Sequence, residues 1–350
     1  MSLQRLTLRR LIVALIAALL AMVAIMLVCS LLGADMSGGK FSFLSITDVW
    51  HGITGHETGA SRIYVFARLP RVLAAAVVGA GLAGAGCAFQ AVLRNPLAEP
   101  YTLGVSSGAS LAAVLAIRFG ADSTLLGGSA LSLASLGGAG LTVYLVWRLG
   151  KIGNTLPPAT LLLAGITVAT FCSAATMFIQ HTSSFVELSR MIYWFMGGLD
   201  LTSYGELGRA SLLIGIGVIV LVLYGRDLNA VSTGADAAAS VGVNASRTIT
   251  VVFAAASVIV GAAISIAGPI GFIGLLTPHA MRAMVGADHR ALLPVSMAAG
   301  AALLVVCDTI ARVAFFPNEL PVGIVTALIG APFFVYLLLR EKSRGQLWGG

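Results

Sequence analysis

The sequence predicts an all-α integral membrane protein of about ten transmembrane helices, because its composition fits no water-soluble domain. Of its 350 residues, 58% are hydrophobic and only 10% are charged, whereas charged residues make up about 25% of a typical soluble domain. Apolar runs of about 20 residues, the length that crosses a bilayer core of about 30 Å, recur along the chain. Glycines and alanines recur at four-residue spacing in these runs, which allows helices to pack closely. We therefore expect one polytopic domain over residues 1–350.

The N-terminal part predicts one span followed by a polar segment. Arg5, Arg9 and Arg10 precede an apolar run at 11–32, which is longer than the apolar region of a cleaved signal peptide. We expect an uncleaved first span whose N-terminus lies in the cytoplasm. Residues 33–67 are polar and contain several glycines, and we expect them to lie on the periplasmic side.

The stretch GADMSGGKF within this segment does not fit a nucleotide-binding loop. Such a loop needs two glycines with four residues between them, the second followed at once by Lys and then by Ser or Thr. Here Gly39 separates Gly38 from Lys40, and Phe41 stands where the hydroxyl residue is required. No other segment has the pattern, so ATP is expected to bind a partner subunit, and this chain is expected to hold no cofactor. Basic residues are scattered at the ends of segments, which argues against a nucleic-acid partner.

The second span is a small-residue run from Val72 to Leu93 that ends in a break containing Pro96 and Pro100. A short helix at 103–117 follows this break. The next expected elements are a fourth span ending near Trp147, a fifth at 159–180, a periplasmic segment at 181–207 with an interfacial helix, a sixth span at 208–224 and a cytoplasmic loop at 226–247. The aromatic residues in 181–207 favour a position at the membrane surface.

The C-terminal part repeats this pattern. A seventh span at 248–272 breaks in the proline-containing segment 268–279, and a short eighth helix follows. The ninth and tenth spans are expected at 291–316 and 321–339. A long span, a break and a short helix thus occur twice, and we expect the breaks to face opposite sides. This inverted pseudo-repeat is typical of transporters. Basic residues predominate on the side of the termini, which places both termini in the cytoplasm.

Motifs spread in order over nearly the whole chain carry a resemblance to a known family. They are RLPR (68–71), RNPLAEPYTLGVSSGAS (94–110), LLLAG (161–165), YWFMGGL (193–199), STGADAAASVGV (232–243), GPIGFIGLLTPH (268–279), VGADHRALLP (285–294) and NELPVGIVTALIGAP (318–332). On these motifs the chain resembles the FecCD-type permeases, subunits of ABC importers for ferric siderophores, haem and cobalamin. The resemblance implies a type II importer fold and a homodimer around a central path. It also implies cytoplasmic ABC ATPase subunits on one face and a periplasmic substrate-binding protein on the other.

The resemblance also implies three groups of site residues. The arginines expected to pair with carboxylates of the binding protein are Arg68, Arg71 and Arg312. The residues expected to couple the chain to the ATPase are Asn229, Ser232, Gly234, Ala235, Ala238 and Val241, on a helix around Gly234. The residues expected to form the inner gate are Asn95, Leu97, Pro158 and Ala159. Some relatives carry hydroxyl residues at the last two positions, and this chain does not.

The arginines also admit simpler roles. Arg68 and Arg71 can contact lipid phosphates at the membrane surface. Arg312 lies four residues after Asp308, so the two can form an ion pair within one helix. Both roles of Arg312 can hold if Asp308 orients it. No metal site is expected, because His279 and His289 are isolated along the sequence.

The expected function is therefore that of a permease subunit that moves an iron chelate, ferric siderophore or haem, across the bacterial inner membrane by alternating access. Cobalamin is the alternative cargo. Lipid and a second permease copy are the expected neighbours in the membrane. A rival interpretation is an ion-coupled secondary transporter with Asp308 or Glu99 as the coupling carboxylate. An intramembrane enzyme using His279 and Asp308 is a third, but no Ser or Cys nucleophile stands at suitable spacing.

Overall fold

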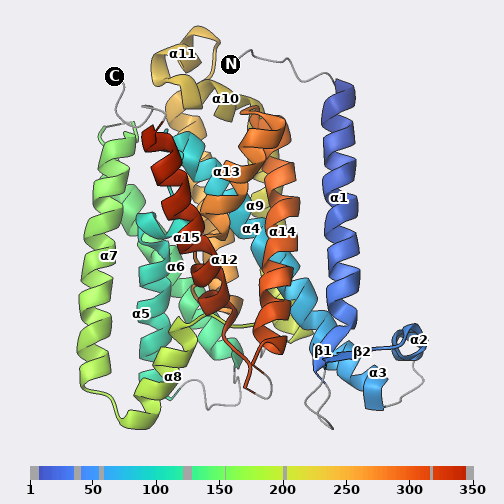
Figure 1. The fold of residues 1–350 in the computed structure, drawn as a ribbon. Coiled ribbons are helices and arrows are strands. Elements are labelled where there is room, and N and C mark those ends of the chain that lie inside the picture. The colour runs from blue at the N-terminus through green and yellow to red at the C-terminus, as the bar shows by residue number, and fades with distance from the viewer. Residues whose placement is uncertain are drawn as a thin grey trace.

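The computed structural model describes residues 8–34, 41–54, 59–120, 128–153, 155–199, 203–315 and 318–343. These residues form a bundle of helices (Figure 1). The helices that correspond to the expected spans are α1 (Leu8–Leu31), α4 (Leu69–Val92), α5 (Val105–Arg118), α6 (Gly128–Gly150), α7 (Pro158–His181), α9 (Tyr204–Leu223), α12 (Ala245–Ala267), α13 (Ile273–Val285), α14 (His289–Val313) and α15 (Val322–Ser343). Among the described helices, seven are long and apolar enough to cross a bilayer. The predicted all-α membrane fold is confirmed.

The remaining elements lie at the two ends of the bundle (Figure 1). At one end are β1 (Leu32–Ala34) paired antiparallel with β2 (Phe41–Phe43), α2 (Ile46–Thr54), α3 (Gly59–Ile63) and α8 (Phe185–Phe195). At the other end are α10 (Gly225–Thr233) and α11 (Ala235–Ser240), together with the first turn of α1 and the last turn of α15. We call these the α8 end and the α10 end. The segments expected on opposite faces of the membrane thus lie at opposite ends.

The second span begins earlier than the sequence predicts. Helical structure is continuous from Ser61 to Val92, because a π-helical turn, Tyr64–Arg68, joins α3 to α4. The wider turn precedes Pro70, whose ring nitrogen has no hydrogen to donate. The end of the 33–67 segment is therefore helix and not loop, while most of the stretch GADMSGGKF lies outside the described residues.

Helix α4 lies at the centre of the bundle and is buried along most of its length. It packs against α14 where Gly79 meets Gly300, and against α13 where Gly86 meets Gly274. A Cβ atom on any of these glycines would overlap the backbone or side chain of the facing helix. The small residues in the sequence thus serve close backbone approach, as expected for helices in a membrane.

The two predicted breaks meet inside the bundle. The first follows α4 and contains a short 3₁₀ helix, Pro100–Leu103. The second separates α12 from α13, and Phe272 there has a φ of 69°, which is unusual for a residue with a bulky side chain. The Glu99 carboxylate accepts a hydrogen bond from the Phe272 amide at 2.6 Å. One carboxylate therefore joins the interrupted segments of both repeats.

Candidate functional site

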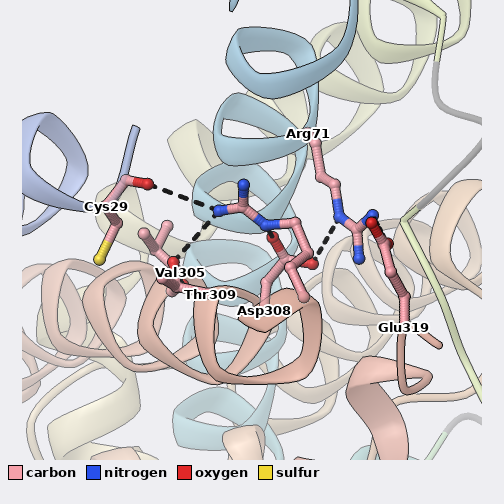
Figure 2. Close-up of polar contacts among 7 residues, drawn as sticks. Cys29, Arg71, Val305, Asp308, Thr309 and Glu319 are labelled. Atoms are coloured by element: carbon pink, nitrogen blue, oxygen red, sulfur yellow. Dashed lines mark hydrogen bonds and ion pairs between the residues drawn. The ribbon is translucent and has the colours of Figure 1, made fainter. Parts of the chain in front are cut away.

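Arg71 and Arg312 belong to a buried ion cluster around Asp308, and Figure 2 shows the Arg71 side chain between Asp308 and Glu319. Asp308 on α14 is 0% exposed, and Arg71 and Arg312 are 8% and 7% exposed. The Arg71 Nε atom lies 2.8 Å from one oxygen of Asp308, and the Arg312 Nε atom lies 3.1 Å from the other. Arg71 also donates to Glu319, which follows α14. Each oxygen of Asp308 thus holds one guanidinium group.

The cluster connects four parts of the chain. Arg71 comes from α4, Asp308 and Arg312 come from α14, and Glu319 lies between α14 and α15. Arg312 also donates to the Cys29 carbonyl oxygen of α1 at 3.5 Å. The ion pair expected within one helix is therefore present. In this conformation Arg71 and Arg312 face the chain's own carboxylates, and their predicted pairing with a binding protein stays a prediction.

Arg68 is placed differently from the other two arginines. It is half-buried, and its Nη1 atom donates to the Leu31 carbonyl oxygen at 3.3 Å. This bond joins the start of the second span to the end of α1. Arg68 and Arg312 thus both bond to carbonyl oxygens in the last turn of α1, and Arg312 also bonds to Asp308.

The predicted coupling helix is two helices. Gly234, with a φ of 141°, separates α10 from α11, and other residues rarely adopt this backbone conformation. Each of the two helices has buried residues. Ala238 is 0% exposed, and the side chain of Asn229 bonds to Asp288 of the same chain. Both residues therefore contact the chain itself in this structure, and their predicted contact with an ATPase stays a prediction.

Most members of the predicted coupling set are at least partly exposed, and most of these have small side chains. Ala235 is exposed, Val241 is 67% exposed, and Ser232 and Gly234 are partly exposed. These residues lie at the α10 end, beyond the ends of the spans (Figure 1). Together with Asn229, which is also partly exposed, they are the members of the predicted coupling set that another protein could touch.

A tryptophan is expected to have different effects on stability at a buried and at an exposed position of the α10–α11 segment. Ala238→Trp is expected to destabilise α11 by about 1–3 kcal/mol, because the buried position has no room for an indole ring. Val241→Trp is expected to leave the segment folded, because the side chain points to solvent. Hydrogen exchange of the α10–α11 amides checks this, and equal protection in both variants would contradict the inward placement of Ala238.

The predicted gate residues lie where α4 ends and where α7 begins. Asn95 is exposed, and its side-chain oxygen accepts a hydrogen bond from the Leu97 amide at 2.9 Å, which shapes the turn after α4. Pro158 begins α7, a position that suits proline because the first amides of a helix have no partner within it. Ala159 is exposed. Both pairs lie at helix termini, and their gating role stays a prediction.

An open cavity of about 380 Å³ lies between α5 and α7. Hydroxyl and amide groups line much of it, and they come from Ser106, Ser110, Ser173, Thr176 and Gln180. Phe195 of α8 and Pro269 of the second break complete its wall. The helix that begins at the predicted gate therefore also lines this cavity. Among the described residues, no group of three His, Cys, Asp and Glu side chains could hold a metal ion.

Sequence reasoning missed four residues that the structure brings into these sites. Glu319 completes the ion cluster, and Arg94 donates to the Val231 carbonyl oxygen of α10 at 3.2 Å. Asp288 and His289 hold the side chain of Asn229. Arg94 and Glu319 lie inside quoted motifs, as do Asp288 and His289, but nothing local in the sequence reveals their partners.

Comparison with known proteins identifies the family. The model of the FecCD transport family matches residues 22–340. The chain belongs to the FecCD transport family. It is 43% identical over 277 residues to the cobalamin import system permease protein BtuC of Halobacterium salinarum, which covers 79% of this chain and 73% of the relative. It is 37% identical over 330 residues to the hemin transport system permease protein HmuU of Yersinia pestis, with 93% and 96% covered.

A solved structure supports the same assignment for this FecCD family member. It is described as an inward-facing conformation of a metal-chelate type ABC transporter. It superposes on this chain with a TM-score of 0.80 and 29% sequence identity, and the match covers 93% of this chain and 98% of that one. The chain is thus a multi-pass membrane permease of the ABC importer type, as its motifs predict.

Proposed function

We propose that the chain is the translocation subunit of an ATP-driven importer for a metal chelate in the bacterial inner membrane. The observation that carries the proposal is the end-to-end likeness to a metal-chelate type ABC transporter, which covers 98% of that chain. Haem and cobalamin permeases among the relatives support the same cargo class. An iron chelate, haem or a ferric siderophore, is the proposed cargo, and cobalamin is the alternative that the cobalamin permease of Halobacterium salinarum favours.

The proposed arrangement follows from the two ends of the bundle. The α10 end would face the cytoplasm and contact ABC ATPase subunits through Ala235, Val241 and their neighbours, which are exposed. The α8 end would face the periplasm and receive a substrate-binding protein near Arg68. ATP would bind the partner subunits. A second permease copy would complete the path, with the hydroxyl-lined cavity beside α7 facing the cargo.

Arg71 and Arg312 would then contribute to docking only after a rearrangement. Both bond to Asp308 in this structure, so a carboxylate on the binding protein would have to compete with a buried one. Charge-assisted pairs of this kind would give orientation as well as attraction. We propose that Arg68 makes the first contact and that the cluster responds to it.

Reconstitution tests the proposed function. The permease, an ABC ATPase and a substrate-binding protein would be assembled in liposomes, and uptake of haem, a ferric siderophore and cobalamin would be compared. We expect ATP-dependent uptake of at least one chelate, abolished when the ATPase cannot hydrolyse ATP. Uptake that ignores ATP and stops with an uncoupler would overturn the proposal in favour of an ion-coupled transporter.

A further inference from the structure

The side chain of Asn229 joins α10 to the start of α14. Its Nδ2 atom donates to Asp288 Oδ1 at 2.8 Å. Its Oδ1 atom accepts from the His289 amide at 2.8 Å and lies 2.7 Å from His289 Nδ1. Both the nitrogen and the oxygen of the Asn229 side-chain amide therefore form hydrogen bonds, to two consecutive residues at the start of α14. Such a contact fixes orientation as well as distance.

The partners of Asn229 are themselves held in place. Asp288 is the N-cap of α14, because its Oδ1 atom also accepts from the Arg290 amide at 3.0 Å. Burial alone would raise the pKa of Asp288, but the bonds from Asn229 and the Arg290 amide, with the Arg290 charge, hold that pKa below its ordinary value. The Asp288 carboxylate is therefore charged at neutral pH, and His289 beside it is 4% exposed. A charged acceptor strengthens the bond from Asn229.

A second bond joins α10 to the end of α4. Arg94 Nε donates to the Val231 carbonyl oxygen at 3.2 Å. Leu228 and Val231, on the same helix as Asn229, are both 0% exposed. Helix α10 therefore contacts the inner ends of α4 and α14 through buried side chains and through separate hydrogen bonds.

Helices α4 and α14 are packed as a pair. At Gly79 and Gly300 their backbones touch, and neither position has room for a side chain. At the far end of the pair, Arg71 of α4 bonds to Asp308 of α14. Sliding one helix along the other would break these contacts, because close-packed interiors do not deform continuously. An ion pair therefore joins the two helices at the α8 end, and both helices contact α10 at the other end.

We propose that Asn229 is a positioning residue that transmits displacement of α10 to the α4–α14 pair, and through it to the Asp308 ion cluster. The inference rests on the proposed function, in which an ATPase moves α10 and a binding protein docks at the α8 end. It assigns to Asn229 a connection inside the permease in place of a contact with the ATPase. It also explains how the Asp308 cluster at the α8 end could change when an ATPase moves α10 at the opposite end.

Exchanging the two side chains tests the connection in the reconstituted complex. Asn229→Asp alone removes the Nδ2 donor and sets a second carboxylate beside Asp288, and it is expected to lower uptake per ATP about tenfold. Adding Asp288→Asn restores an amide facing a carboxylate and keeps acceptors for the His289 and Arg290 amides. Uptake per ATP is then expected to return to within about twofold of the unaltered complex. The ATP-dependent change in binding-protein affinity is expected to fall and recover in parallel.

Asn244→Asp is the matched control. Asn244 lies in the same cytoplasmic segment, but its side chain caps α12 locally by accepting from the Arg247 amide at 3.0 Å. Aspartate caps helices as well as asparagine does, so no change in uptake per ATP is expected. Asn229→Ala, which adds no charge, gives a second variant if Asn229→Asp folds poorly, and it is expected to lower uptake per ATP about threefold.

Three results would be decisive. Normal uptake per ATP in both Asn229 variants would overturn the inference. So would an exchanged pair as defective as Asn229→Asp alone, because the polar connection would then not be the cause. An unaltered complex that assembles but shows no ATP-driven uptake would instead overturn the proposed function, and the inference with it.

Discussion

Replacing Asp308 with alanine is expected to lower the free energy of unfolding by roughly 3–5 kcal/mol, the range for removing one partner of a buried ion pair. Asp308 is fully buried and bonds to both Arg71 and Arg312. Without it, two guanidinium groups would remain in a place closed to water, and Glu319 would be the acidic group left to Arg71. Thermal unfolding in lipid nanodiscs, followed by tryptophan fluorescence, measures the effect.

Glu319→Gln is the control for this prediction. The Glu319 side chain is 45% exposed, and exposed ion pairs contribute at most about 1 kcal/mol because water screens them. The control should therefore unfold within a few degrees of the unaltered protein. An equal loss of stability in both variants would mean that burial does not set the cost, and would contradict the description of the cluster.

Stability and docking at the cluster can be separated. Buried ionic triads replaced by apolar residues of similar volume are often as stable as before. The triple replacement Arg71→Met, Asp308→Leu and Arg312→Leu should therefore be better folded than Asp308→Ala. Association of this variant with the binding protein then reports on docking alone. Unchanged association at low salt would remove Arg71 and Arg312 from the docking surface and leave Arg68.

The spans and breaks of this fold were predictable from the sequence because they depend on local properties. Apolar runs of membrane length place the long helices, and the prolines after α4 and near α13 mark the interruptions. The start of the second span was misplaced, because a π-helical turn before Pro70 leaves no signal in composition. The inverted repeat itself stays a prediction, and the bond between Glu99 and Phe272 brings together the two breaks that were expected to face opposite sides.

The partners of the site residues were not predictable in the same way. Arg71 and Glu319 are 248 residues apart in the chain, and no local pattern links them. The coupling segment was read as one helix, so Ala238 and Asn229 were assigned to the exposed side with their neighbours. The backbone of Gly234 divides the segment into two helices, and Ala238 on the second of them is buried. Only the intrahelical pair of Asp308 and Arg312 was predictable, because its spacing is local.

Replacing Gly86 with alanine is expected to lower the free energy of unfolding by roughly 3 kcal/mol, at the upper end of the usual cost of overpacking. A Cβ atom there would lie 2.6 Å from the Cα atom of Gly274 and closer still to its carbonyl group. The obstacle is backbone, so no rotamer change can relieve it, and α13 would have to move away from α4. Because Gly274 also packs against Pro100, the same movement would strain the junction of the two breaks.

Gly140→Ala on α6 makes the same chemical change where a Cβ atom meets nothing within 4 Å. Alanine favours helix over glycine, so this control should be neutral or up to about 1 kcal/mol more stable. Thermal unfolding of the two variants in the same nanodiscs gives the comparison. Equal shifts of the unfolding midpoint in the two variants would contradict the conclusion that Gly86 and Gly274 are needed for the close approach of α4 and α13. If only Gly86→Ala is destabilised, the Phe272 amide should also exchange hydrogen faster. Phe272 directly precedes α13, so a shift of α13 would weaken the hydrogen bond from this amide to Glu99.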